Sequence, residues 1–377
     1  MVASPLLTLQ SSGLYCEAGE FYIDPWEPVD RALITHAHSD HARPGSKAYL
    51  AAEPGRLLLR TRLGDDATIQ TVPYERSLQI GSVSVSFHPA GHLLGSSQIR
   101  LEHKGEVWVV SGDYKLDPDK TCAPFEPVPC HQFITEATYG LPIYRWPPAA
   151  DVFNQINSWW RQNQERGKAS LIYCYALGKA QRILSGIDPN IGPIFTHGAI
   201  ERLNIDYRQS GIALPSTQLA AIAPRKTDWS TALILAPPSA SGTPWLRRFG
   251  NPATAFASGW MSVRGMRRRK AVDRGFVLSD HSDWTGLLAA IKGSGAERIF
   301  VTHGYVPILV RYLQERGVAA EGLSTRFEGE QMESAAFAIA AAREQADTES
   351  LSHVAEDAAM EQLMIDAVGK HSAERTS

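Results

Sequence analysis

The sequence predicts an α/β protein made of two domains. Its 377 residues exceed one ordinary domain and suit two, each large enough to bury its own core. Strand patterns dominate up to about residue 140, whereas helical and strand patterns alternate between about 141 and 269. Such alternation is typical of an open α/β unit, so the middle of the chain is expected to fold as one.

The first part consists of short patterns rich in β-branched and aromatic residues, bounded by Gly, Pro and Asp. These strand patterns fall at 14–24, 31–35, 47–51, 83–88, 97–103, 105–112 and 132–137. The segment 141–150 carries three prolines and marks a change of character. Beyond it we expect a helix over 151–167, a strand over 169–175 and a second helix from about Leu177. Strands over 275–279 and 297–303 and helices over 283–295 and 306–317 follow.

The composition argues against membrane and secreted classes. Hydrophobic residues make up 44% and charged residues 20%, which is typical of a soluble globular protein. No run of eighteen apolar residues occurs, and the N-terminus has neither a basic region nor a sustained apolar stretch of a signal peptide. Cys16, Cys122, Cys130 and Cys174 form no CxxC pair. They fit small, mostly buried thiols in a reducing cytoplasm.

Charge is distributed unevenly along the chain. The segment 328–377 carries eleven acidic and three basic residues, so its net charge is −8. The total is −3, which leaves the remaining body at +5. A mildly basic body suits a polyanionic substrate. The acidic segment, rich in Ala and Glu, is expected to form one or two exposed helices or to be partly disordered, and it could compete with nucleic acid for a basic face.

The strongest chemical signal is His36-Ala-His38-Ser-Asp40-His41, which directly follows the apolar pattern at 31–35. Four polar groups at one strand end need partners, and a metal ion satisfies histidine and carboxylate together. In a turning loop His36 and His38 point the same way, whereas Asp40 and His41 project toward a neighbouring position. The spacing therefore favours two ions over one, and the alternative is a solvated polar loop.

Four further residues follow, or lie near, apolar strand patterns, where loops of an α/β scaffold present functional groups. They are His92 in AGHLLGSS, Asp113 in VVSGDYK, His281 in LSDHSDW and His303 in VTHGY. Each histidine alone could be a hydrogen-bonded structural residue. Together with the first cluster, and in this order, they indicate a metal centre.

HAHSDH, AGHLLG, SGDYK and VTHGY together resemble the metallo-β-lactamase fold. TEATYG, LGKAQRIL and LSDHSDW resemble its β-CASP branch, whose members are nucleases acting on DNA or RNA. FVLSDHSDW, the Arg-rich SGWMSVRGMRRRKAVDRG and VTHGY are most similar to bacterial ligase-associated DNA exonucleases. Those proteins are thought to work beside an ATP-dependent DNA ligase and a helicase in repair. The resemblance covers about residues 5–330.

The resemblance implies a metallo-β-lactamase αββα sandwich with an inserted α/β β-CASP domain. The sandwich would take residues 1–140 and 270–327, the insertion 141–269, and the acidic tail 328–377. One ion would be held by His36, His38 and His92, the other by Asp40, His41 and His303, with Asp113 bridging both. Zn²⁺ suits these ligands and Mn²⁺ is the alternative. Asp24 would orient a ligand histidine, or it is a plain turn residue before Pro25.

The resemblance also implies phosphodiester hydrolysis. Two ions in such a site lower the pKa of a shared water, so that hydroxide attacks phosphorus in line. His281, paired with Glu136, would act as the general acid, because a neighbouring carboxylate raises the pKa of a histidine into the working range. The alternative is a buried His–Glu pair that only braces the junction between domains.

Contacts to substrate are assigned from simpler signals. A basic run holds Arg264, Arg267, Arg268 and Arg269, which suits phosphate binding or is a solvated face. Ser239 and Ser241 in PSASG, and His197 in FTHGAI, could seat a terminal phosphate or belong to ordinary turns. Lys115, close to Asp113, could touch the substrate phosphate.

Four functions remain open on the sequence. A DNA exonuclease in repair is favoured, and an RNA-processing nuclease would use the same site. A small-molecule metallo-hydrolase would share the HxHxDH motif but would need neither the insertion nor His281 with Glu136. A non-catalytic binding module would be expected to lack ligands, and all seven are present.

Overall fold

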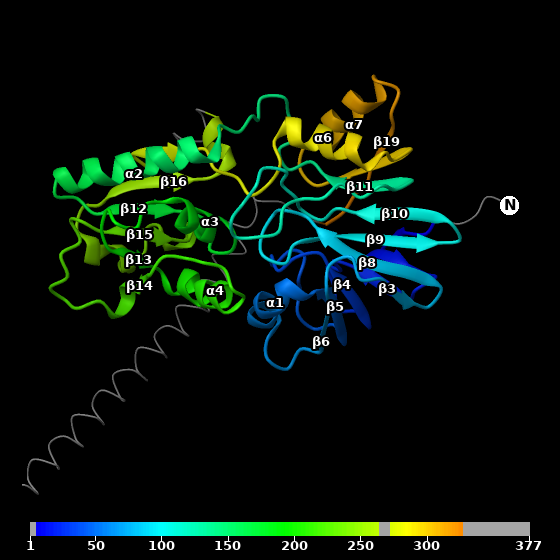
Figure 1. The fold of residues 1–377 in the computed structure, drawn as a ribbon, viewed down its shortest axis with the longest axis horizontal. Coiled ribbons are helices and arrows are strands. Elements are labelled where there is room, and N and C mark those ends of the chain that lie inside the picture. The colour runs from blue at the N-terminus through cyan, green and yellow to red at the C-terminus, as the bar shows by residue number, and fades with distance from the viewer. Residues whose placement is uncertain (1–4, 264–271, 327–377) are drawn as a thin grey trace, which may run out of the picture.

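The structure is a computed structural model that describes residues 5–263 and 272–326 (Figure 1). Two packed sheets, with helices on their outer faces, form one part of the molecule, and a third sheet forms the other, with three α-helices among its described residues. The expected acidic tail and the four arginines of the basic run lie outside the described residues. No helix of the described residues is long and apolar enough to cross a bilayer.

The first sheet has six strands in chain order, antiparallel from β1 to β3 and parallel from β3 to β6. It consists of β1 (Thr8–Gln10), β2 (Gly13–Cys16), β3 (Phe21–Ile23), β4 (Arg31–Ile34), β5 (Ala48–Ala52) and β6 (Ile69–Val72). Helix α1 (Arg56–Leu63) follows β5 closely and packs on the outer face of the sheet. The carboxyl end of β4 carries the HxHxDH motif.

The second sheet has seven strands in the order β19-β18-β11-β10-β9-β8-β7. They are β7 (Leu78–Ile80), β8 (Val83–Pro89), β9 (Ser97–His103), β10 (Glu106–Val110), β11 (Gln132–Glu136), β18 (Arg298–Thr302) and β19 (Ala319–Gly322). Helices α6 (Trp284–Ser294) and α7 (Val306–Gln314) cover its outer face (Figure 1). The layers are therefore helix, sheet, sheet and helix, which confirms the predicted αββα sandwich.

Alternation of side chains along the strands creates both faces of this sandwich. In β10, Trp108 and Val110 enter the core between the two sheets, while Val109 enters the core beneath α6 and α7. In β11, Ile134 likewise enters the core between the sheets, and Phe133 enters the core beneath the two helices. Burial of these side chains on both faces explains why the central strands are nearly continuous hydrophobic runs.

Local signals fix the limits of α6. Asp283 precedes the helix, and its side chain accepts a hydrogen bond from the backbone N–H of Gly286 at 2.8 Å. Gly295 ends the helix in the left-handed conformation, with φ of 60°. The predicted span 283–295 therefore coincides with the helix and its two caps.

The third sheet is entirely parallel and lies between β11 and β18 in the sequence. Its order is β14-β13-β15-β12-β16-β17. The strands are β12 (Ser170–Tyr173), β13 (Ile194–Thr196), β14 (Gln218–Leu219), β15 (Leu233–Ala236), β16 (Ala253–Ala257) and β17 (Arg274–Phe276). Helices α2 (Ala149–Glu165), α3 (Lys179–Gly186) and α4 (Gly198–Gln209) pack on one face. We call this part the inserted unit.

The third sheet continues beyond residue 269, where the insertion was expected to end. β17 pairs in parallel with β16, so the sheet extends to Phe276. The strand pattern at 275–279 was assigned to the sandwich, because a short edge strand carries no signal that tells which sheet it joins. β18 then returns to pair with β11, which makes the middle of the chain an interruption of the second sheet.

The inserted unit shares a core with the sandwich. One cluster of buried side chains joins Ile34 of β4 and Leu58 of α1 to Leu177 and Tyr207 of the inserted unit. Leu93 and Leu94, beside His92, belong to the same cluster. The two parts therefore meet through packed apolar side chains next to the HxHxDH loop.

A glycine contact in the His92 loop generates a first prediction. Gly95 has φ of +78°, and a Cβ there would overlap the backbone of Gly55, just before α1. We expect Gly95→Ala to lower the free energy of unfolding by about 3 kcal/mol, because backbone strain and a backbone clash add. Urea denaturation of the purified protein measures the change.

Gly105→Ala is the matched control for this prediction. Gly105 has φ of +81°, but a Cβ there would meet no other atom of the described residues within 4 Å. Only the conformational strain of about 1 kcal/mol is therefore expected. Equal losses of stability in the two variants would contradict a close contact between the His92 loop and the start of α1.

Candidate metal centre

The HxHxDH loop leaves the carboxyl end of β4 and turns sharply. The backbone N–H groups of His41 and Ala42 both donate to the carbonyl of His38, at 3.2 and 2.8 Å. This turn separates the loop into two halves, with His36 and His38 in one and Asp40 and His41 in the other. His36, His38 and His41 are all buried, which an unpartnered polar loop would not be.

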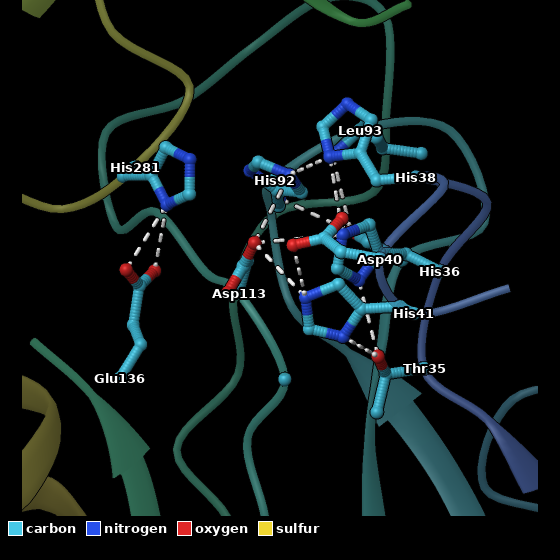
Figure 2. Close-up of polar contacts among 12 residues, drawn as sticks. Thr35, His36, His38, Asp40, His41, His92, Leu93, Asp113, Glu136 and His281 are labelled. Atoms are coloured by element: carbon cyan, nitrogen blue, oxygen red, sulfur yellow. Dashed lines mark hydrogen bonds and ion pairs between the residues drawn. The ribbon is translucent and has the colours of Figure 1, made fainter. Parts of the chain in front are cut away.

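The first group of potential ligands consists of His36, His38, His92 and Asp113. Their ligand atoms lie within 4.8 Å of one another (Figure 2). Nδ1 of His38 is 3.1 Å from Nε2 of His36 and 3.1 Å from Nε2 of His92. Three imidazole nitrogens from two loops therefore converge on one position, as a tetrahedral metal site with a carboxylate requires.

The second group consists of Asp40, His41 and His303. Nε2 of His41 is 3.6 Å from Oδ2 of Asp40, and the rings of His41 and His303 stack with centroids 5.4 Å apart. His303 directly follows β18 and has φ of 59°, a conformation that turns its backbone sharply at the strand end. His303, which follows the inserted unit in the sequence, therefore lies beside the HxHxDH loop.

Asp113 lies between the two groups. Its Oδ2 is 3.5 Å from Nε2 of His36, in the first group, and 3.5 Å from Nε2 of His41, in the second. The structure therefore places Asp113 where one carboxylate can serve two ions. All seven ligands expected from the sequence converge in this way.

Asp24 anchors the base of the loop. Its carboxylate accepts hydrogen bonds from the backbone N–H of Thr35 at 2.8 Å and from its hydroxyl at 2.5 Å. Oδ2 also lies 2.7 Å from Nδ1 of His41, so Nε2 of that ring is the nitrogen that faces the second group. This geometry favours the orienting role of Asp24 over that of a plain turn residue.

The ring nitrogens that face away from the first group also have partners. Nδ1 of His36 lies 3.0 Å from the hydroxyl of Thr35, and Nε2 of His38 lies 3.3 Å from the carbonyl of Leu177. Nδ1 of His92 lies 2.8 Å from the carbonyl of Asp280. The last two partners were not predicted from the sequence, because a backbone carbonyl leaves no signature in the residue type.

The electrostatics of the first group suit metal binding. Burial lowers the pKa of His36, and it lowers the pKa of His38 and of His92 to about 4. These imidazoles are therefore neutral at pH 7, which is the form that ligates a metal.

In the second group the carboxylates dominate. Burial alone would lower the pKa of His41, but Asp40, Asp113 and Asp24 outweigh it and raise that pKa well above its usual range. Burial would likewise raise the pKa of Asp113, yet the surrounding imidazoles, His41 foremost, hold it well below its usual range. A positive charge is therefore strongly favoured beside these carboxylates.

The residues present fit two divalent ions. Oδ1 of Asp40 and Oδ1 of Asp113 are buried and accept no hydrogen bond from the described residues. Buried carboxylate oxygens without partners are costly unless a cation or water satisfies them. Histidine nitrogen with carboxylate oxygen suits Zn²⁺ and also admits Mn²⁺.

His281 and Glu136 form a pair at the edge of the first group. Nδ1 of His281 lies 3.1 and 3.0 Å from the two oxygens of Glu136, and the ring lies 4.6 Å from that of His92 (Figure 2). Glu136 also accepts a hydrogen bond from the backbone N–H of Tyr114 at 2.9 Å. One ligand atom each of Asp113, Glu136 and His281 falls within 4.8 Å. The pair therefore faces the ligands rather than the domain junction alone.

The side chain of Lys115 lies against Asp119. Its side chain is fully buried, and Nζ lies 3.8 Å from Oδ2 of Asp119. Burial lowers the pKa of this lysine to about 8. Because Asp119 attracts the ammonium into the protein, the position of Lys115 does not support the expected contact with substrate phosphate.

The residues expected to seat a terminal phosphate lie in the inserted unit. Ser239 lines a pocket of about 80 Å³ with Leu177, Arg62 and Arg202, beside the carbonyl that contacts His38. The side chain of Ser241 forms a hydrogen bond with that of Tyr173. His197 precedes α4, and its Nδ1 accepts from the backbone N–H of Ala199 at 3.2 Å. Only Ser239 among these three lines that pocket.

Several known proteins are similar to this chain. It is 30% identical over 316 residues to a probable DNA ligase of Opitutus terrae, covering 82% of this chain and 30% of the ligase. It is 27% identical over 205 residues to Ribonuclease TTHA0252 of Thermus thermophilus, covering 47% of this chain and 45% of that protein. An RNase J-like protein of Methanocaldococcus jannaschii is 27% identical over 222 residues, covering 51% of this chain and 53% of that protein. The chain thus spans about half or less of the length of these relatives.

A solved structure of a protein of unknown function from Enterococcus faecalis V583 has a similar fold. It matches 79% of this chain and 80% of its own length with a TM-score of 0.50 and 12% identity, so the likeness concerns the fold alone. No family model matches the chain.

The αββα sandwich, with two groups of histidine and aspartate ligands at one edge, defines a protein of the metallo-β-lactamase superfamily. Within that superfamily the chain belongs to the β-CASP branch. The resemblance predicted from the sequence is thereby confirmed at the level of the superfamily and its branch.

The contacts of Asp24 generate a second prediction. Asp24→Ala removes the partner of Nδ1 of His41, so we expect affinity for one of two ions to fall about 10- to 100-fold. Competition against a chromophoric chelator measures both affinities. Asp30→Ala, which removes an exposed carboxylate paired with Lys47, is the control and should bind both ions normally. Unchanged affinities in Asp24→Ala would refute the orienting role.

Proposed function

We propose that this protein is a two-metal phosphodiesterase that degrades DNA from its ends. The observation that carries the proposal is the His281–Glu136 pair, which lies beside the ligand groups and faces Asp113. Hydrolysis of a thioester or lactone would not need a buried acid pair at this position. Cleavage of a phosphodiester needs a proton for the departing alkoxide, and the pair can supply it.

The chemistry divides between the ions and the side chains. His36, His38, His92 and Asp113, with Asp40, His41 and His303, would hold two divalent ions, which would supply activation of a water molecule and neutralisation of phosphate charge. Glu136 holds Nδ1 of His281, so the proton that His281 gives to the leaving oxygen is the one on Nε2. Asp113 and Asp24 keep the ligand rings oriented throughout.

DNA is favoured over RNA by one relative and by the sequence motifs. Among the three relatives, the longest stretch of similarity is to a protein named a probable DNA ligase, of which the aligned part is 30%. A region joined to a ligase in one chain would be expected to act on DNA ends. The two other relatives are named as ribonuclease or RNase J-like, so an RNA-processing nuclease with the same mechanism is the second candidate.

We also infer partners and a cellular setting for this activity. We propose action in DNA repair beside an ATP-dependent DNA ligase and a helicase, in the cytoplasm. Free thiols at Cys16 and Cys174, both buried, are in keeping with a reducing compartment. Zn²⁺ is the ion that the imidazole-rich first group favours, with Mn²⁺ as the alternative.

Matched substrates test the proposal. Purified protein should shorten end-labelled single-stranded DNA more than RNA of the same sequence, when Mn²⁺ or Zn²⁺ is supplied. Asp113→Ala should abolish the activity, since this carboxylate faces both ligand groups. Gel analysis of both label positions gives the polarity. Preference for RNA would shift the assignment to RNA processing, and cleavage of neither would favour a small-molecule hydrolase.

The proposed acid gives a separate prediction. His281→Ala should lower the rate of cleavage by about 10²- to 10⁴-fold while leaving both ions bound. Single-turnover kinetics with metal analysis of the same sample checks both statements. His103→Ala, at a half-buried histidine of β9 whose Nδ1 lies 2.9 Å from the carbonyl of Ser82, should cleave normally. Loss of an ion together with activity would make His281 a ligand rather than the acid.

A further inference from the structure

Two histidines of the first group, His38 and His92, contact backbone carbonyls that belong neither to the HxHxDH loop nor to the His92 loop. His38 contacts the carbonyl of Leu177, which lies in the inserted unit two residues before the start of α3. His92 contacts the carbonyl of Asp280, in the segment that returns from the inserted unit. In contrast, His41 of the second group is held by Asp24, within the first part of the sandwich.

A buried ion pair joins the segment that carries the Leu177 carbonyl to Asp280, which carries the other carbonyl. Nζ of Lys179, the first residue of α3, lies 3.0 Å from Oδ1 of Asp280, and both side chains are almost completely buried. The ammonium also lies 4.4 Å from the centre of the Tyr175 ring. Lys179 is two residues from Leu177, so one short segment of the inserted unit carries the partner of His38 and also pairs with the residue whose carbonyl contacts His92.

The surrounding contacts fix this segment. Gly178 has φ of +86°, and a Cβ there would lie 3.1 Å from Oδ2 of Asp280, so a larger residue would crowd the pair. The backbone N–H of Gly178 donates to Oε1 of Gln181 at 2.8 Å. Arg182, one turn further along α3, donates to the carbonyl of Ser279, next to Asp280. The first turn of α3 therefore contacts two adjacent residues of the returning segment, Ser279 and Asp280.

We propose that Lys179 is a positioning residue for the ion of His36, His38 and His92. By pairing with Asp280, Lys179 holds in place the backbone carbonyl that orients His92. Because Lys179 is two residues from Leu177, the pair also fixes this carbonyl relative to the Leu177 carbonyl that orients His38. The inserted unit therefore takes part in holding the ligands of the first group. The proposal rests on the two-metal centre of the proposed function, but it concerns binding of the ions rather than cleavage.

The expected effect follows from the burial of the pair. Removal of one partner leaves an uncompensated buried charge, and the other partner then moves or takes up water. Outer partners of ligand histidines typically change metal affinity by about 10- to 100-fold when they are lost. A change of this size should be confined to the first group, because Lys179 acts on Asp280, whereas Asp24 holds His41 of the second group.

Zinc binding by the full chain tests the proposal. Lys179→Met keeps the length of the side chain but removes its charge, and it should weaken one of two zinc ions about 10- to 100-fold. Competition with a chromophoric chelator and metal analysis after dialysis report the two affinities. Excess zinc should restore cleavage, which it would not do if the substitution had only damaged the fold.

Asp280→Asn is the second variant and leaves the backbone carbonyl in place. It should weaken the same ion, and the double variant should lose no more than the stronger single variant, because the two side chains act as one pair. Arg208→Met is the control, since it breaks an ion pair with Glu201 inside the inserted unit at 3.1 Å, distant in sequence from the ligands. It should bind both ions as the unaltered protein does.

The outcomes separate this proposal from the proposed function. Unchanged affinities in both variants, or equal loss of both ions, would overturn the positioning role. Weakening of one ion in a protein that binds two would support it. If the unaltered protein binds only one ion and Lys179→Met weakens the binding of that ion, the positioning role is supported and the two-metal centre is contradicted.

Discussion

The metal centre depends on one constraint, which is that a buried ligand imidazole needs a partner for the nitrogen that does not face the ion. A neutral ring that ligates through one nitrogen carries a proton on the other, and that proton is costly to bury unless it is accepted. Thr35, Asp24, Leu177 and Asp280 provide acceptors or polar partners for four of the rings. These outer contacts decide which nitrogen of each ring points inward, and they specify the site as much as the ligands do.

The architecture satisfies this constraint by bringing strand ends together. Ligands or their partners lie at or just beyond the carboxyl ends of β4, β8, β10, β11 and β18, and β10, β11 and β18 are neighbours in one sheet. Their carboxyl ends share an edge, because β10, β11 and β18 run parallel. The edge is closed by the inserted unit, which packs against it through Leu93, Leu94 and Leu177. The ligand histidines beside this packing, His36, His38 and His92, are correspondingly buried.

The sequence predicts the ligands better than it predicts their surroundings. HxHxDH, with its density of polar residues after an apolar strand, indicates the metal centre directly, and the Asp283 and Gly295 caps delimit α6. The sheet of the inserted unit runs past the expected boundary, because β17 is a three-residue edge strand whose partner no local pattern reveals. Leu177 and Asp280 were not predicted as partners, since they act through backbone carbonyls. Lys179 lay in a recognised motif, but its burial against Asp280 depends on a contact across 101 positions.

The pairing of β11 with β18 has a consequence for biosynthesis. Gln132 lies opposite Arg298, so the second sheet stays incomplete until the ribosome has made the whole inserted unit. A nascent chain ending before β18 holds most of the imidazoles but lacks His303 and the strand that aligns it. Long-range strand pairing of this kind is slow. Assembly of the second group of ligands is therefore a late event, and a fragment released prematurely would carry an incomplete site.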